Sequence, residues 1–444
     1  MKRLIILAVL SSAFFLFAQE ADEKIRTITV EDAVILAADN NISLKRQKIN
    51  LETLKRRNST SWNSVGPSTS LGGNLTKTLG PVLSDPAQLQ SQAQPQREKA
   101  DFSYSISAGL GITLTPSLYT SIRDAKLKYE SGKTSYEDAV RQVELNVRKL
   151  FYSLLYTKES MNLQRRNMET ARLRYENNRD KYNRGQLSEL DLLQSQYSYE
   201  SQRPSIESAE IAYQNNIASF KQMLGISQEE KIELAGSLSD AIPPESFTIS
   251  KTVDELPSVK KIKVSIEQQK NTLLATRFST YGPTVSANYS YNFSGDNTIK
   301  ELKKHTDSQT ISLRVSIPLD GYIPWSNGVL SVKNQKATLK DLELQLENER
   351  TTAELNLQNS IKNILQKQSQ MELLNRNVEI AQKAYDMTLT AYNHGSRDLL
   401  SLQNASDSLL KAKTDRESHI YNLISAVLDL ENTLGVPFGT LGNE

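Results

Sequence analysis

The chain of 444 residues carries 53 basic and 51 acidic residues, so it lacks the basic excess of a nucleic-acid-binding protein, and no nucleic-acid partner is expected. It has no cysteine and only three histidines, which excludes disulfides, a thiol nucleophile and cysteine-ligated zinc and leaves little for a histidine-based metal or catalytic site. An enzyme is therefore the least favoured class, no metal or cofactor is expected, and a hydrophobic content of 38% favours long amphipathic helices over one thick core.

Residues 1–18 predict a secretory signal peptide. Two basic residues precede an apolar run over 4–17, and Ala18 suits the last position before cleavage. The run of about 14 residues falls short of the roughly 20 that cross a bilayer as a helix, which disfavours the alternative of a membrane anchor. With a signal peptide, the mature protein is expected to leave the cytoplasm. Because no other long uncharged apolar run occurs, it should enter a membrane, if it does so, without helices.

The rest of the chain consists of two tandem repeats, 19–225 and 258–436, with a connecting segment at 226–257 and a tail at 437–444. The sequence matches itself at positions 210 apart, without a gap over roughly a hundred residues. Matched stretches include Glu144-Leu145-Asn146 with Glu354-Leu355-Asn356, Tyr182-Asn183-Arg184-Gly185 with Tyr392-Asn393-His394-Gly395, and Leu224-Gly225-Ile226 with Leu434-Gly435-Val436. Each repeat predicts a short helix, two strands, a very long helix and a returning helix, and the connecting segment predicts one short strand.

Acidic residues, prolines and glycines mark the expected helix boundaries. The first short helix should begin near Thr29, because two acidic residues in its first turn suit the helix dipole, and its counterpart should begin after Pro257. Pro204 has no N–H and should break or kink the returning helix of the first repeat. Gly185 and Gly395 are expected to end the two long helices, since glycine accepts a left-handed conformation without strain.

Four segments predict strands by alternating apolar and polar residues, at 68–79, 102–115, 284–293 and 309–318. The alternation is unbroken in the second segment and weakest in the first, which contains adjacent glycines. One face of each strand is therefore apolar and the other is small and polar. The loops at 80–101 and 295–308 are polar and should lie in solvent, and Lys77 and Arg314 are the clear charges expected on the polar face.

These strands fit either a soluble β-sandwich or a membrane. Most of them reach about ten residues, the length of a tilted transmembrane strand, and aromatic residues lie near their ends, which favours the membrane. Four strands cannot close a barrel, and an open edge in lipid leaves backbone groups without hydrogen bonds. Several chains must therefore pool their strands, and three chains would supply twelve.

The two long helices carry apolar residues at seven-residue spacing, which predicts a left-handed supercoil. The positions are Val147, Leu154, Met161, Met168, Tyr175 and Tyr182 in the first repeat and Leu357, Ile364, Met371, Val378, Tyr385 and Tyr392 in the second. A helix over 121–182 would be about 90 Å long at 1.5 Å per residue. An intramolecular coiled-coil hairpin explains this seam equally well. A second apolar set, including Phe151, Leu155, Ile361 and Leu365, indicates neighbours on two sides.

A signal peptide, two tandem repeats, two strands per repeat and a Tyr-x-x-Gly turn between heptad helices together resemble the TolC family of outer-membrane efflux proteins. The resemblance extends from about Thr27 to Leu434. It implies a mixed, mainly α fold, in which a long coiled-coil helical barrel is continuous with a transmembrane β-barrel completed by trimerisation, with four strands per chain. It also implies an outer-membrane location with a long periplasmic extension.

The function implied by this resemblance is that of a passive channel, the exit duct of a tripartite efflux or type I secretion system. Its implied partners are two further copies of the chain, outer-membrane lipid, a periplasmic adaptor (a membrane-fusion protein) and an inner-membrane pump. The alternative from a different class is a secreted or periplasmic structural coiled-coil scaffold. The polar residues expected in the lumen favour no particular exported compound or pump class.

A gate at the periplasmic tip follows from the same resemblance. Tyr392 and Arg397 match the family's second-repeat Tyr-x-x-Gly-x-Arg stretch, and Asp191 matches the acidic residue of the first repeat. A charge-assisted bond from Arg397 to Asp191 would hold a closed state and yet be separable. Considered by its position alone, Arg397 is a solvated charge just past a turn.

The sequence departs from the family's pattern at the entrance to the pore and matches it at two turns. Ser401 and Asn404 occupy positions where family members often carry acidic rings, and Asp398 and Asp407 lie nearby but out of register, so strong cation binding is not expected. The two turns match the family's adaptor-docking tips. Their residues are Asn183, Arg184, Gly185, Gln186 and Leu187 in the first repeat and Asn393, His394, Gly395 and Ser396 in the second. His394 is expected to be an exposed turn residue rather than a ligand or a pH switch.

Overall fold

The computed structural model describes residues 25–77, 102–244, 252–297 and 305–441. The signal peptide expected over 1–18 lies outside the described residues, as do most of the two expected solvent loops and part of the connecting segment. In the described part of the chain, no helix is both long and apolar enough to cross a membrane.

Contacts divide the chain into two units, and each is described by itself. The sheet unit comprises residues 49–135 and 258–350, and the helical unit comprises the remaining described residues. Two helices of 67 residues each, α3 (Ser117–Asn183) and α7 (Asn327–Asn393), contribute to both units.

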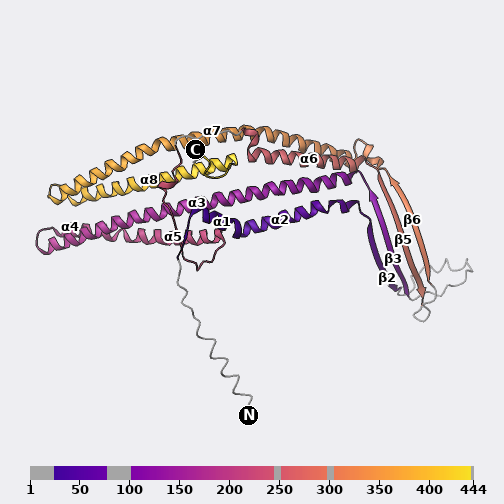
Figure 1. Cartoon of the computed structure of the whole chain (residues 1–444), viewed down its shortest axis with the longest axis horizontal. Coiled ribbons are helices and arrows are strands. Elements are labelled where there is room, and N and C mark those ends of the chain that lie inside the picture. The colour runs from indigo at the N-terminus through magenta and orange to yellow at the C-terminus, as the bar shows by residue number, and fades with distance from the viewer. Residues whose placement is uncertain (1–24, 78–101, 245–251, 298–304, 442–444) are drawn as a thin grey trace, which may run out of the picture. The chain divides into compact units, whose positions relative to one another are not determined.

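The sheet unit contains one antiparallel sheet of four strands in the order β2-β3-β5-β6 (Figure 1). The strands are β2 (Ser68–Lys77), β3 (Phe102–Leu114), β5 (Thr284–Asn297) and β6 (Thr306–Ser316). β5 continues past its expected end at 293, and β6 begins before its expected start at 309. The hydrogen-bonded ladder includes these added residues, since Asn297 pairs with Phe102 and Thr306 pairs with Ser294. Backbone N–H and C=O groups form the ladder whatever the side chains are, so a strand can extend beyond the residues that alternate between apolar and polar.

The sheet has one apolar face, which remains exposed in the single chain. Leu71, Ala108 and Tyr291 lie in register across three strands on this face. On β6, Ile311 is 84% exposed and Leu313 is 73% exposed. Among the described residues, strands β2 and β6 each pair on one side only, so the sheet also has two open edges. A sheet with an uncovered apolar face and open edges is incomplete in water.

Lys77 lies on the apolar face, so the prediction that it lies on the polar face was wrong. It pairs with Phe102, and its ammonium nitrogen lies 5.3 Å from the centroid of that ring. Because side chains alternate along a strand, Lys77 shares the face of Leu75. Arg314 does lie on the polar face, opposite Ser286.

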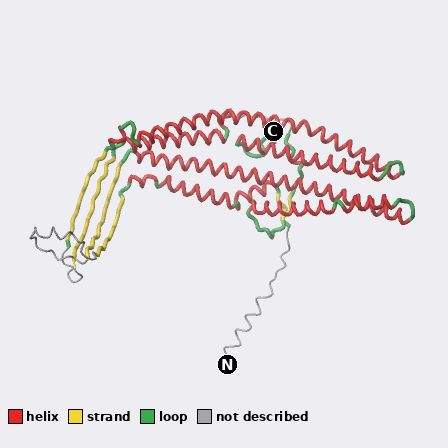
Figure 2. The backbone as a smooth tube through the Cα atoms, turned by 180° about the vertical axis from the view of Figure 1, so that it is seen from behind, coloured by secondary structure: helices red, strands yellow, loops and turns green. Residues whose placement is uncertain are grey.

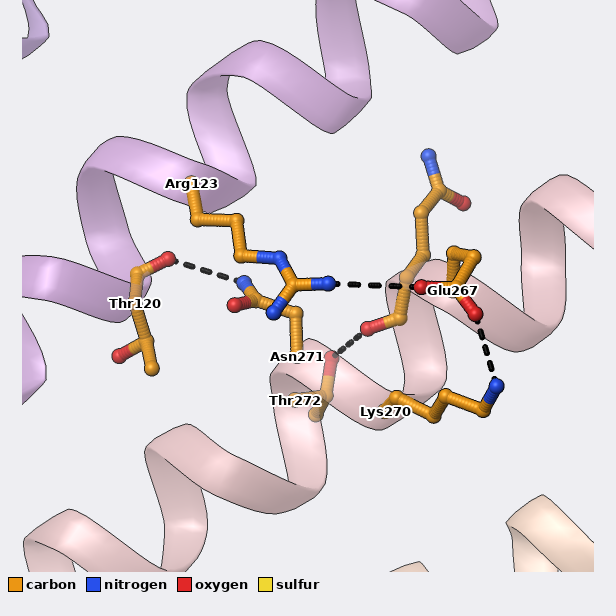
Figure 3. Close-up of polar contacts among 7 residues, drawn as sticks. Thr120, Arg123, Glu267, Lys270, Asn271 and Thr272 are labelled. Carbon is orange, nitrogen blue, oxygen red and sulfur yellow. Dashed lines mark hydrogen bonds and ion pairs between the residues drawn. The ribbon is translucent and has the colours of Figure 1, made fainter.

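In the sheet unit, a buried amide joins α6 (Pro257–Tyr281) to α3. The second half of α2 (Ile42–Ser59) leads through a 3-10 turn, η1 (Ser61–Val65), into β2, and α6 leads into β5. Asn271 of α6 is 2% exposed and donates its Nδ2 hydrogen to the carbonyl oxygen of Thr120 on α3, at 2.9 Å (Figure 3). An ion pair from Arg123 to Glu267, at 3.4 Å, lies beside it (Figure 3). A further 3-10 turn, η5 (Leu319–Tyr322), separates β6 from α7.

In the helical unit, the single short helix expected near Thr29 is two helices, α1 (Val30–Asn40) and α2. α1 begins near Thr29 as expected, and Thr29 caps it, with its hydroxyl accepting a hydrogen bond from the Asp32 N–H at 3.1 Å. Asn41 makes the break. Its Oδ1 accepts a hydrogen bond from the Ser43 N–H at 2.9 Å and caps α2, and its Nδ2 donates to the Met223 carbonyl.

A two-stranded parallel sheet joins the start of the chain to the connecting segment. It pairs β1 (Arg26–Ile28) with β4 (Ile232–Leu234), and the segment also holds the 3-10 turns η3 (Ser239–Ala241) and η4 (Val253–Glu255). β4 matches the short strand expected in the connecting segment. β1 was not expected, because three residues are too few to show an alternation.

The returning helices are α4 (Glu189–Glu200) and α5 (Arg203–Leu224) in the first repeat and α8 (Leu399–Leu434) in the second. The break between α4 and α5 lies beside Pro204, as expected. The heptad seam is buried near its start, where Val147 and Ile364 are 0% exposed, and opens toward the end of α3, where Tyr182 is 38% exposed. Leu365, from the second apolar set, is 51% exposed and has an unoccupied side in the single chain.

Candidate functional site

The α3–α4 turn forms the first candidate tip. Gly185 has φ = 73°, and its N–H donates to the Tyr182 carbonyl at 2.8 Å while the Gln186 N–H donates to the Lys181 carbonyl at 2.9 Å. These bonds satisfy the last carbonyls of α3 and end the helix. Ser188 then caps α4, accepting a hydrogen bond from the Asp191 N–H at 3.1 Å.

The α7–α8 turn has the same hydrogen-bond geometry. Figure 2 draws each of the two turns as a short loop between helices. Gly395 has φ = 74°, its N–H donates to the Tyr392 carbonyl at 2.9 Å, and the Ser396 N–H donates to the Ala391 carbonyl at 2.9 Å. Asp398 caps α8, accepting a hydrogen bond from the Ser401 N–H at 2.9 Å. Hydrogen bonds from Ser401 lower the pKa of Asp398, so this carboxylate stays charged.

Both turns are exposed and leave open space around their glycines. A Cβ atom built on Gly185 or on Gly395 would meet nothing within 4 Å. Asn183 to Gln186 and Asn393 to Ser396 are exposed, and Leu187 is partly buried. The two tips therefore have matching backbone geometry and accessible surface.

Among the described residues, no hydrogen bond or ion pair joins the predicted gate residues Asp191, Tyr392 and Arg397 to one another. Tyr392 donates its hydroxyl hydrogen to Oδ1 of Asn178 on α3, at 3.1 Å. Asp191 instead accepts a hydrogen bond from the Ser188 hydroxyl at 2.7 Å. Arg397 is exposed, and no hydrogen bond or ion pair within the described part of the chain joins it to Asp191.

The other predicted positions lie on the first turns of α8. Ser401 is the partner of the α8 cap, and Asn404 is exposed with its carbonyl accepting from the Ser408 hydroxyl at 2.7 Å. Asp407 has its pKa raised by burial, against the lowering effect of Arg174 on α3.

Asn178 is the site residue that the sequence reasoning missed. It is 1% exposed and lies three positions after Tyr175 of the heptad seam, where a coiled coil places its second core residue. A polar residue at such a core position was the available signal. The described residues hold no group of three or more His, Asp and Glu side chains placed to bind a metal.

A family model described as outer membrane efflux protein matches residues 76–226 and 249–436, which is most of both repeats. The chain belongs to the outer membrane efflux protein family. This agrees with the resemblance seen in the sequence, and it places the protein in the outer membrane as an efflux channel rather than a scaffold. No curated protein matches the sequence.

Solved structures of outer-membrane proteins share the fold of this efflux protein. The CmeC outer membrane channel of Campylobacter jejuni is 17% identical with a TM-score of 0.73, and the alignment covers 91% of this chain and 85% of that one. VceC of Vibrio cholerae is 12% identical with a TM-score of 0.72, covering 92% and 96%. The open state of the MtrE channel of Neisseria gonorrhoeae is 16% identical with a TM-score of 0.69, covering 92% and 89%.

Proposed function

We propose that three copies of this chain form the passive exit duct of a multi-component efflux or type I secretion system. The observation that carries the proposal is the four-stranded sheet. Its two edges are open, and Ile311 and Leu313 leave an apolar face exposed. Joining the edges of three copies gives twelve strands, which satisfies the edge hydrogen bonds and turns the apolar face to lipid.

The partners on the inner side are a periplasmic adaptor and an inner-membrane pump. The exposed turns around Gly185 and Gly395 support docking, because backbone with open space beside it permits close approach. The duct itself supplies no energy, and the pump drives export.

The resting gate includes a bond between Arg397 of one copy and Asp191 of the next. Among the residues that the structure describes, Arg397 forms no such bond, and its exposed guanidinium, beside Asp398, is accessible to a neighbouring copy. The Ser188 hydroxyl holds the Asp191 carboxylate in a fixed position at 2.7 Å. A pair of this kind is strong enough to hold a closed state and weak enough for a docked adaptor to separate.

Planar-bilayer conductance of detergent-purified protein, with its oligomeric mass measured alongside, tests the duct. We expect a trimer that gives small, discrete channels. Extraction of the cell envelope without detergent is the control for the scaffold reading, since a scaffold would be released. A protein that leaves the envelope without detergent and gives no channels would overturn the proposal.

A further inference from the structure

The apolar face of the sheet changes in composition along the strands. At the end that joins the helices it is aliphatic, with Leu114, Val285 and Val315 paired side by side across β3, β5 and β6. At the other end, where the strands lead into loops, it is aromatic, and the ring centroids of Tyr104 and Phe293 lie 6.0 Å apart. Aromatic side chains collect where the hydrocarbon of a bilayer meets its headgroups. The loop end of this face therefore suits the depth of the lipid headgroups.

Lys77 stands at the outermost level of this face. It pairs with Phe102, which pairs with Asn297, the last residue of β5. The described pairing of β5 with β6 starts three residues nearer the helices, at Ser294 with Thr306. A lysine on the lipid face of a barrel is strongly unfavourable at the bilayer centre and nearly neutral at the interface. The level of Lys77 is therefore the level at which this face can carry a charge.

The charge of Lys77 is not neutralised within the described part of the chain. Its Nζ lies 5.3 Å from the centroid of the Phe102 ring, and no carboxylate among the described residues forms an ion pair with it. The ring attracts the ammonium group and holds the side chain against the sheet, but it takes up none of the hydrogen bonds that an ammonium group gives to oxygen. An exposed ammonium group held in this way is suited to a phosphate group.

Other polar side chains at this end restrict where an anion is favoured. Asp307 pairs with Phe293 and so lies on the apolar face, where its carboxylate repels an anion from the β6 side. The ring of His305 lies against the same phenylalanine, with centroids 5.0 Å apart. Lys77 on β2 is therefore the group at this end that favours an anion.

We propose that Lys77 and Phe102, here called the headgroup site, bind the phosphate of an anionic lipid in the outer leaflet of the outer membrane. The Lys77 ammonium group donates hydrogen bonds to the phosphate oxygens, and the acyl chains cover the apolar residues nearer the helices, beginning with Leu75. This continuity with the apolar face favours a lipid over a soluble anion, which would leave that face bare. The inference rests on the proposed duct, and it names a ligand for the face that the duct turns to lipid.

Native mass spectrometry of the protein in a neutral detergent tests the headgroup site. The probe is dioctanoyl phosphatidic acid, counted per chain, and phosphatidylcholine of the same chain length is the comparison because its choline neutralises the phosphate. The unchanged protein should bind phosphatidic acid more tightly. Lys77→Gln should weaken this binding about fivefold, the effect of one cation beside an anionic headgroup, and Lys77→Arg should retain it. Arg314→Gln removes the same charge from the polar face of the sheet and is the matched control, which should bind like the unchanged protein.

Two further arms identify the ligand. Inorganic phosphate at the concentration of the lipid should not displace phosphatidic acid, and displacement would assign the site to a soluble phosphate and overturn the lipid. Asp307→Asn tests the other partner within reach of an edge strand, the same carboxylate on a neighbouring copy. This variant should form the trimer and should not weaken lipid binding. Loss of the trimer in both Asp307→Asn and Lys77→Gln, with equal binding of the two lipids, would show that Lys77 pairs between copies and would overturn the headgroup site.

The outcomes separate the headgroup site from the duct. A trimer in which Lys77→Gln binds phosphatidic acid as tightly as the unchanged protein does would overturn the site and leave the duct in place. An unchanged protein that forms no trimer would overturn the duct. Because binding is counted per chain, the difference between Lys77→Gln and Arg314→Gln would still decide whether Lys77 holds a lipid phosphate.

Discussion

Ser188 and Asp398 occupy equivalent positions of the two repeats and cap α4 and α8 with exchanged side chains. In the first repeat a serine caps the helix and Asp191 bonds to it, whereas in the second an aspartate caps the helix and Ser401 bonds to it. Each tip therefore keeps at least one carboxylate at a helix N-terminus, where the helix dipole stabilises it.

At the same scale, Arg397→Ser should open the resting channel. Loss of a charge-assisted bond removes more than a neutral one does, so the open fraction should rise roughly tenfold or more. Single-channel recording measures it. Arg184→Ser, which removes the same charge from the other tip, is the control and should leave conductance unchanged. Equal effects of the two variants would show that the charge of the tips, and not a bond to Asp191, sets the closed state.

At the scale of elements, the sequence predicted the helices and strands that show a regular spacing of apolar residues. Heptad spacing and strict alternation are local, and they located α3, α7 and the strands from side chains alone. The partner of Tyr392 was not predictable in this way, because Asn178 lies more than two hundred residues away and meets it only through tertiary packing. The break at Asn41 was missed for a similar reason, since its amide also reaches Met223. Lys77 was assigned to the polar face because it is charged. Its position along β2, two residues after Leu75, places it on the apolar face instead.

The two tip turns, which we propose as adaptor-docking sites, can be altered without unfolding them. Asparagine is the side chain that best tolerates the left-handed conformation, so Gly185→Asn with Gly395→Asn should keep both turns while adding bulk to open space. Conductance of the purified protein should be unchanged. Cells carrying the double variant should lose export of any compound whose export deletion of the protein abolishes. Full export by such cells would show that the adaptor docks elsewhere.

At the scale of the whole molecule, assembly in the membrane requires the two faces of the sheet to meet different surroundings. Leu313 and Ser312 are neighbours on β6 and point to opposite faces. Leu313 pairs with Ala287 on the apolar face, and Ser312 pairs with Asn288 on the polar face. The same substitution at the two positions therefore separates contact with lipid from contact with the lumen.

Leu313→Arg should impair insertion, because an arginine on the lipid face costs about 2–4 kcal/mol near the bilayer centre and a trimer would carry three. Ser312→Arg should assemble normally and shift the channel toward anion selectivity, since it adds a second cation beside Arg314 in the lumen. Trimer yield in the membrane fraction and the reversal potential in a salt gradient measure the two effects. Equal trimer yields for the two variants would mean that the apolar face meets protein rather than lipid, and the barrel would then have to be assigned to other surfaces.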